Sequence, residues 1–208
     1  PKNFKLAFQR IVKKLRAAKL SNFSTVYASS SGAKPEDFIN YDPGPEYYEW
    51  VGYSWWGGDK DGQSALDFAR KVKKPVFIAE ATPRGHFFDK EDPDEVWKKW
   101  FEKFFAHMEK NIDVVRATSY INANWDAQDM WDGWGQTRIE TVPSIKTRWL
   151  QKMASPRYVN AADKPFELIG FTKNSTPRNT IAGTYKDPSL SVQERVEDLI
   201  RRMTIEEK

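Results

Sequence analysis

Residues 74–80 read KPVFIAE, a short apolar run that ends in a carboxylate, and this stretch decides how the fold is interpreted. The run follows a proline and is too short for a helix, so it predicts a buried strand of a parallel sheet. An α/β barrel keeps its chemistry at the carboxyl ends of such strands. Glu80 is therefore predicted to be a catalytic carboxylate. The alternative is a structural ion pair with Arg84 or Arg116 at the rim of the sheet.

Helical and strand patterns alternate on both sides of this stretch. Apolar residues at helical spacing predict helices over residues 3–18, 64–72, 92–108 and 143–153. Strands are predicted at residues 23–28, 48–56, 74–80 and 114–125, with a Pro/Gly/Asp-rich loop over 32–45. This alternation indicates right-handed crossovers and a parallel sheet. The sequence thus predicts an α/β fold equal to half of a (β/α)8 barrel.

Composition narrows the classes of function. The chain has 208 residues, no cysteine and two histidines, so thiolate metal sites, disulfides and a histidine metal cluster are not expected. We expect no metal and no organic cofactor. The net charge is only +4 and the basic residues are spread over helix faces, which argues against a nucleic-acid partner. A membrane partner is not expected either, because no apolar run reaches the roughly 20 residues of a membrane span.

Nine tryptophans form the second unusual feature. Three lie on predicted helix stripes and are expected in the core: Trp97, Trp100 and Trp149. Five lie at the ends of predicted strands or in the loops that follow them: Trp55, Trp56, Trp125, Trp131 and Trp134. Flat aromatic faces at the catalytic end of a barrel suit the C–H face of a sugar ring. These five predict a carbohydrate site, the alternative being aromatic plugs that close the rim.

Four segments together carry a family resemblance: residues 47–57 (YYEWVGYSWWG), 74–80, 119–126 (SYINANWD) and 135–139 (GQTRI). In order and spacing they resemble strands five to eight of clan A glycoside hydrolases. The likeness covers about residues 1 to 160 and is greatest to family 26, the group of mannanases and related β-glycanases.

The resemblance implies a retaining double-displacement mechanism on a β-linked polysaccharide such as mannan. Glu80 falls on the nucleophile, while the acid/base motif on strand four would precede Pro1, so the fragment is expected to be inactive alone. Trp125 falls on the tryptophan that floors the subsite of the scissile sugar. Trp56 stands where family members carry a tyrosine that hydrogen-bonds the nucleophile. Either the indole N–H of Trp56 or the hydroxyl of Tyr53 is a candidate to replace that donor. The remaining candidate substrate-binding residues are Trp55, Asn124 and Arg138.

The end of the chain follows another pattern. Residues 161–184 gather Pro, Gly, Ser, Thr and Asn and are predicted to be a linker. Residues 185–208 contain a capping box at Ser191 and Glu194, followed by an apolar helical stripe. This segment resembles the start of a family 3 glycoside hydrolase, the β-glucosidase group. An amphipathic terminal helix is the simpler alternative.

The predicted organisation is therefore a half barrel over residues 1–160, a linker over 161–184 and the first helices of a second, covalently linked glycoside hydrolase module over 185–208. We expect a secreted or periplasmic protein whose signal peptide would lie upstream of Pro1. A different reading makes the barrel a non-catalytic carbohydrate-binding module fused to a β-glucosidase. A structural spacer is a third reading, but it leaves the loop tryptophans unexplained.

Overall fold

The computed structural model describes residues 1–20, 23–58, 60–159, 192 and 195–196. The chain divides into two units, Pro1–Lys152 and Met153–Lys208. The fold described below is that of the first unit. The predicted linker lies outside the described residues, and so does the predicted second module apart from three helical residues at 192, 195 and 196.

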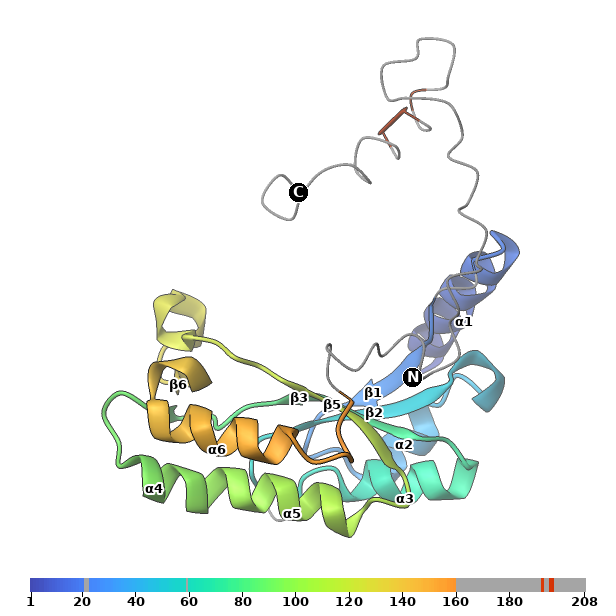
Figure 1. Cartoon of the computed structure of the whole chain (residues 1–208). Helices are drawn as coiled ribbons and strands as arrows, with labels where there is room; N and C mark the ends of the chain where they lie inside the picture. Colours follow the sequence, from blue (N-terminus) through green and yellow to red (C-terminus); the bar gives the residue numbers. More distant parts are fainter. Residues whose placement is uncertain (21–22, 59, 160–191, 193–194, 197–208) are drawn as a thin grey trace. The chain divides into compact units, whose positions relative to one another are not determined.

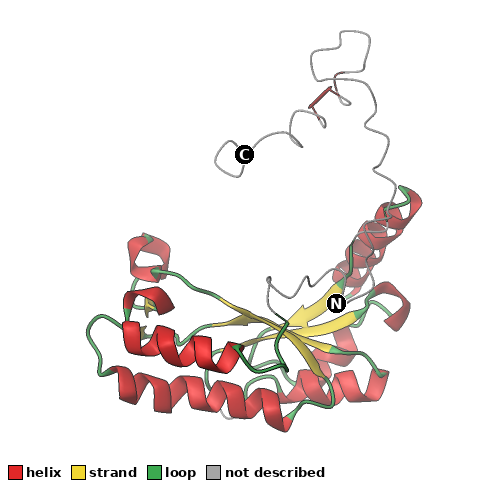
Figure 2. Ribbon diagram, in the orientation of Figure 1, coloured by secondary structure: helices red, strands yellow, loops and turns green. Residues whose placement is uncertain are grey.

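The first unit is an α/β fold built on a parallel sheet (Figures 1 and 2). The strands are β1 (Val26–Ser29), β2 (Trp50–Trp55), β3 (Val76–Ala81) and β5 (Val115–Tyr120), and they lie in the order β1-β2-β3-β5. The two-residue strands β4 (His86–Phe87) and β6 (Gly135–Gln136) pair with each other, also in parallel. The α/β class and the parallel arrangement of the four predicted strands are confirmed.

The helices are α1 (Lys2–Ala17), α2 (Pro35–Tyr41), α3 (Gln63–Val72), α4 (Pro93–Val96), η2 (Trp97–Phe101), α5 (Glu102–Lys110) and α6 (Pro143–Met153), with short 3₁₀ turns η1 (Pro45–Tyr47), η3 (Trp125–Ala127), η4 (Asp129–Trp131) and η5 (Ile139–Thr141). Figure 1 shows α3, α5 and α6 along one side of the sheet. Within the described residues, no helix is both long and apolar enough to cross a membrane.

The predicted aromatic stripe forms the main helix–sheet contact. Its members Trp97, Trp100, Phe101, Phe104, Phe105 and Met108 are buried. Trp149 of α6 packs on Phe101, Phe105 and Tyr120. The prediction that these tryptophans lie in the core is confirmed for Trp97 and Trp100, while Trp149 is half-buried at the margin of the same aromatic contact. A π-helical turn, η2, lies within this stripe.

Two secondary-structure predictions were wrong, and one pair of short strands was not predicted. Residues 35–41 form α2 inside the predicted loop, because Pro35 starts the helix and Asp37 accepts a hydrogen bond from the Lys34 N–H. Strand β5 ends at Tyr120 instead of residue 125, because the Asn122 side chain bonds the Ile139 N–H and the chain turns there. The pair β4–β6 had no signal in the sequence pattern.

Candidate active site at the carboxyl end of the sheet

Glu80 owes its position to a β-bulge. In the register of β2 with β3, Tyr53 pairs with Ile78 but Ser54 pairs with Glu80, so Ala79 is the extra residue. Strict alternation would put Glu80 on the same face as Ile78, which is fully buried against the helices. The bulge turns Glu80 to the opposite face, where it is exposed, while Ala81 returns to the buried face.

Ser54 holds the Glu80 carboxylate. Its hydroxyl donates a hydrogen bond to Oε2 of Glu80 over 2.7 Å. The predicted alternative, an ion pair, is not formed among the described residues. The Arg84 guanidinium lies over the Trp134 ring at 4.4 Å, and Arg116 donates to the Asp113 carbonyl. Among the residues that the structure describes, Glu80 is therefore a carboxylate that is oriented by one hydrogen bond and is not paired with a cation.

Four half-buried tryptophans surround this edge of the sheet, and we call them the tryptophan cluster: Trp56, Trp125, Trp131 and Trp134. Trp134 is the centre, with ring centroids 5.6, 5.2 and 4.8 Å from those of Trp56, Trp125 and Trp131 respectively. The indole N–H of Trp125 reaches the Thr82 hydroxyl at 3.5 Å, two residues beyond Glu80. The cluster and the carboxylate thus lie at the same end of β3.

Gly135 fixes the loops that carry the cluster. It has a φ of +95°, and a Cβ there would lie 2.0 Å from the carbonyl oxygen of His86. Only glycine permits this close approach, which lets β4 and β6 pair. The Asp126 carboxylate accepts a hydrogen bond from the Gly135 N–H, and the Gly85 N–H donates to the Trp134 carbonyl.

Two other predicted residues lie at this end of the sheet. Asn124 is half-buried and forms an isolated bridge with Gln136. Arg138 donates from its backbone N–H and its Nε to the Gln136 side-chain oxygen. Both residues therefore contact Gln136 of β6, next to the segment that carries Trp125 and Trp134.

Tyr53 and Trp55 do not belong to the site, and their prediction as sugar contacts is wrong. Both are buried, and the alternation of β2 puts them on the helix-covered face with Val51. The Tyr53 hydroxyl lies 2.6 Å from Nε2 of His107, and Trp55 packs on Trp100 and Phe104. Burial raises the pKa of Tyr53, and burial also lowers the pKa of His107.

The structure adds residues that sequence reasoning missed as parts of the site. Ser54 lies between Tyr53 and Trp55, so alternation alone could have placed it on the opposite face. Thr82 is fully buried and hydrogen-bonds the hydroxyl of Thr137, which ties the end of β3 to the segment after β6. No local signal in the sequence predicts that contact. Arg84 was considered only as a partner of Glu80.

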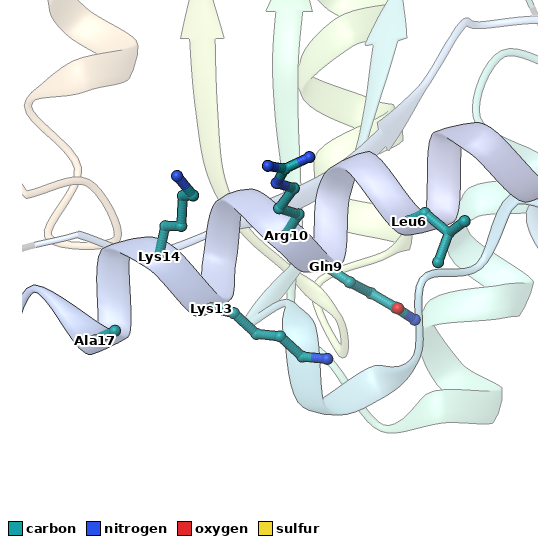
Figure 3. A pocket seen from close by; sticks show the side chains of 6 residues that line it. All are labelled: Leu6, Gln9, Arg10, Lys13, Lys14 and Ala17. Atoms are coloured by element: carbon teal, nitrogen blue, oxygen red, sulfur yellow. The ribbon is translucent and has the colours of Figure 1, made fainter.

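A separate surface hollow of about 500 Å³ lies along α1. Figure 3 shows its lining, with every side chain supplied by that helix: Leu6, Gln9, Arg10, Lys13, Lys14 and Ala17. None of these residues belongs to the cluster or contacts Glu80, so we do not assign the site to this hollow.

No protein-family model matches the chain. One sequence relative is the β-1,3-xylanase TXYA from Vibrio sp, which is 27% identical over an alignment that covers 81% of this chain and 43% of the relative. Another is a β-1,3-xylanase from Alcaligenes sp, which is 28% identical over an alignment that covers 81% of this chain and 42% of the relative. The chain spans less than half the length of these relatives.

Two solved structures have a similar fold. GH26C from Muricauda sp. MAR_2010_75 has a TM-score of 0.54 at 13% identity, with 78% of this chain and 44% of that chain covered. A double mutant of the Cellulomonas fimi endo-β-1,4-mannanase has a TM-score of 0.54 at 18% identity, with 77% and 36% covered. The chain therefore shares part of the fold of these two structures.

Proposed function

We propose that this chain forms strands five to eight of a (β/α)8 glycoside hydrolase and that Glu80 is the nucleophile of a retaining enzyme acting on a β-linked polysaccharide. The observation that carries the proposal is the bulge in β3, which exposes Glu80 at the carboxyl end of a parallel strand next to the tryptophan cluster. Carboxyl ends of barrel strands are where catalytic groups gather. Sequence similarity to two β-1,3-xylanases supports the same conclusion.

In the proposed mechanism, a Glu80 oxygen attacks the anomeric carbon as the bond from that carbon to the leaving oxygen breaks. A second carboxyl group, on strand four of the complete barrel, protonates the leaving oxygen. It then removes a proton from the water that hydrolyses the glycosyl–Glu80 ester, so the configuration is retained. The two carboxyl groups need to be about 5 to 5.5 Å apart. The Ser54 hydrogen bond on Oε2 leaves Oε1 of Glu80 as the attacking oxygen.

Binding of the glycan is assigned to the tryptophan cluster. Trp125 is the proposed platform for the scissile sugar, because its indole is held by Thr82 directly after β3. Trp56 extends the platform on the side of β2, where its ring meets the edge of Trp134. Asn124 and Arg138 are the proposed polar contacts to sugar hydroxyls.

β-1,3-Xylan is the first substrate to test, because the sequence relatives carry that name at 27% and 28% identity. β-1,4-Mannan is the second, because one structure of similar fold is an endo-β-1,4-mannanase at 18% identity. Both glycans consist of pyranose rings whose C–H faces suit aromatic platforms.

We also retain the proposal that the protein is a secreted or periplasmic, multi-module enzyme in which residues 185–208 begin a family 3 module. Its support is the capping box and apolar stripe of that segment, most of which lies outside the described residues.

The test compares two matched glutamate variants of the full-length protein, Glu80→Gln and Glu140→Gln, on both glycans. Glu140 is also exposed, and it accepts a hydrogen bond from the Asn122 side chain, so it controls for loss of an exposed, hydrogen-bonded carboxylate. Release of reducing sugar is expected to fall more than about a thousandfold for Glu80→Gln and less than about twofold for Glu140→Gln. A Glu80→Gln rate within about tenfold of the parent would refute the assignment. Glycan binding without hydrolysis by the unmodified protein would favour the carbohydrate-binding module.

A further inference from the structure

Arg84 occupies an unusual place beside the tryptophan cluster. Its guanidinium lies over the Trp134 ring at 4.4 Å, and Trp134 is the ring that contacts the three other cluster members. The residue itself is exposed. A guanidinium stacked by its face keeps its in-plane N–H donors directed away from the ring, toward solvent. Among the described residues, no group accepts a hydrogen bond from the Arg84 side chain, so its N–H donors are available to a ligand while the guanidinium lies over the indole.

This arrangement is held by the backbone on both sides of the arginine. The Arg84 N–H donates to the Thr82 carbonyl at 2.9 Å, and the next residue, Gly85, donates to the Trp134 carbonyl at 2.9 Å. The second of these bonds joins the loop after β3 directly to the residue on which the guanidinium stacks. The stacking is thus built into the pairing of two loops, and Arg84 has less conformational freedom to lose on binding than an unsupported surface arginine.

The donors of Arg84 are not engaged by any carboxylate among the residues that the structure describes. Three other described arginines have such partners: Arg16 pairs with Glu49, Arg70 with Asp113 and Arg148 with Asp94. Two more, Arg116 and Arg138, donate instead to a backbone carbonyl and to a side-chain amide oxygen. A guanidinium fork matches a carboxylate bidentately, and such charge-assisted bonds are about twice as strong as neutral ones. A neutral sugar hydroxyl would use only part of this capacity.

We infer that Arg84 and Trp134 form a subsite for a carboxylate-bearing sugar, a uronic acid unit or branch of the glycan. The inference rests on the proposed function, because it assumes that the tryptophan cluster binds carbohydrate. Because the guanidinium covers one face of Trp134, the uronic ring lies on the part of the tryptophan cluster beside Arg84, and its carboxylate accepts two N–H bonds from Arg84.

The test uses one matched pair of ligands. The first is a xylo-oligosaccharide that carries one glucuronic acid branch, and the second is the same compound after reduction of the carboxylate to a hydroxymethyl group. Affinities are measured by calorimetry and by tryptophan fluorescence on the full-length protein. The acidic ligand is expected to bind about tenfold more tightly than its reduced form.

Two variants separate charge from geometry. Arg84→Gln is expected to abolish the preference while leaving the affinity for the reduced ligand within about twofold. Arg84→Lys keeps the charge but loses the fork, so a preference of only about twofold to threefold is expected. Equal affinity of the unmodified protein for both ligands would overturn the inference and leave the proposed function standing. An equal loss of affinity for the acidic and the reduced ligand in Arg84→Gln would also overturn the inference, because Arg84 would then act only by holding Trp134 in place. If neither ligand binds, the carbohydrate site falls and the inference falls with it.

Discussion

Replacing Gly135 with alanine tests whether the loops of the site are held together by the close approach of β4 and β6. Gly135 and Gly133 both have positive φ, at +95° and +79°. A Cβ on Gly135 would lie 2.0 Å from the His86 carbonyl oxygen, whereas a Cβ on Gly133 would have nothing within 4 Å. Gly133→Ala is therefore a control for backbone strain without a clash.

The expected sizes follow from these contacts. Alanine in the left-handed region costs about 1 to 2 kcal/mol at either position. At Gly135 the strands β4 and β6 must also move apart, because real Cβ contacts do not fall below 3.0 Å. That movement breaks two backbone hydrogen bonds, Gly85 N–H to Trp134 and Phe88 N–H to Gln136. At about 0.5 to 1.5 kcal/mol each, their loss adds about 1 to 3 kcal/mol.

The assay is urea denaturation followed by tryptophan fluorescence, which reports directly on the cluster. Gly133→Ala is expected to lower the free energy of unfolding by about 1 to 2 kcal/mol and Gly135→Ala by about 2 to 5 kcal/mol. Gly135→Ala should also weaken oligosaccharide binding, and Gly133→Ala should not. If the two variants lose the same stability within about 0.5 kcal/mol, the tight β4–β6 contact does not hold the site, and our description of it is wrong.

Two further predictions concern the core and the sheet edges. Burial lowers the pKa of His107, so on acidification the unfolded chain takes up a proton before the folded chain does, and the free energy of unfolding should fall as the pH drops below about 6.5. Urea titrations between pH 5 and 8 should show this fall for the parent protein and a flatter profile for His107→Gln. An equal slope for parent and variant would contradict the prediction. Strands β1 and β5 each have one neighbour in the main sheet, so residues 1–160 expressed alone should associate through these edges in a concentration-dependent way. A monomer in analytical ultracentrifugation at all concentrations would count against the half barrel.

The parts of the fold that depend on periodicity were predictable. The helix stripe over residues 93–108 and the four parallel strands follow from apolar spacing, because burial of one face determines both patterns. Helix α2 was not predictable from composition, since Pro and Asp occur in loops as well as at helix starts. The sequence also does not reveal the pair β4–β6, which rests on a contact between residues about 50 positions apart in the chain, His86 and Gly135.

The candidate site was predicted only in part, for a related reason. Glu80 was identified from its place at the end of an apolar run, but strict alternation would have buried it with Ile78. Its exposure depends on the bulge at Ala79, and no residue type in this segment predicts a bulge. The error on Tyr53 and Trp55 was avoidable, because alternation from the buried Val51 puts both on the helix-covered face. Ser54 would have emerged from the same argument.

Covalent trapping tests the central claim, that Glu80 is a glycosidic nucleophile, most directly. A dinitrophenyl 2-deoxy-2-fluoro-β-xylobioside carries a leaving group that departs without protonation, so labelling needs the nucleophile but not the acid/base residue. We predict that the full-length protein gains the mass of one fluoro-xylobiosyl group and that peptide fragmentation places it on Glu80. The label should be absent from Glu80→Gln and present on Glu140→Gln. A label on a different carboxylate, or hydrolysis of the glycan with no label at all, would contradict the account.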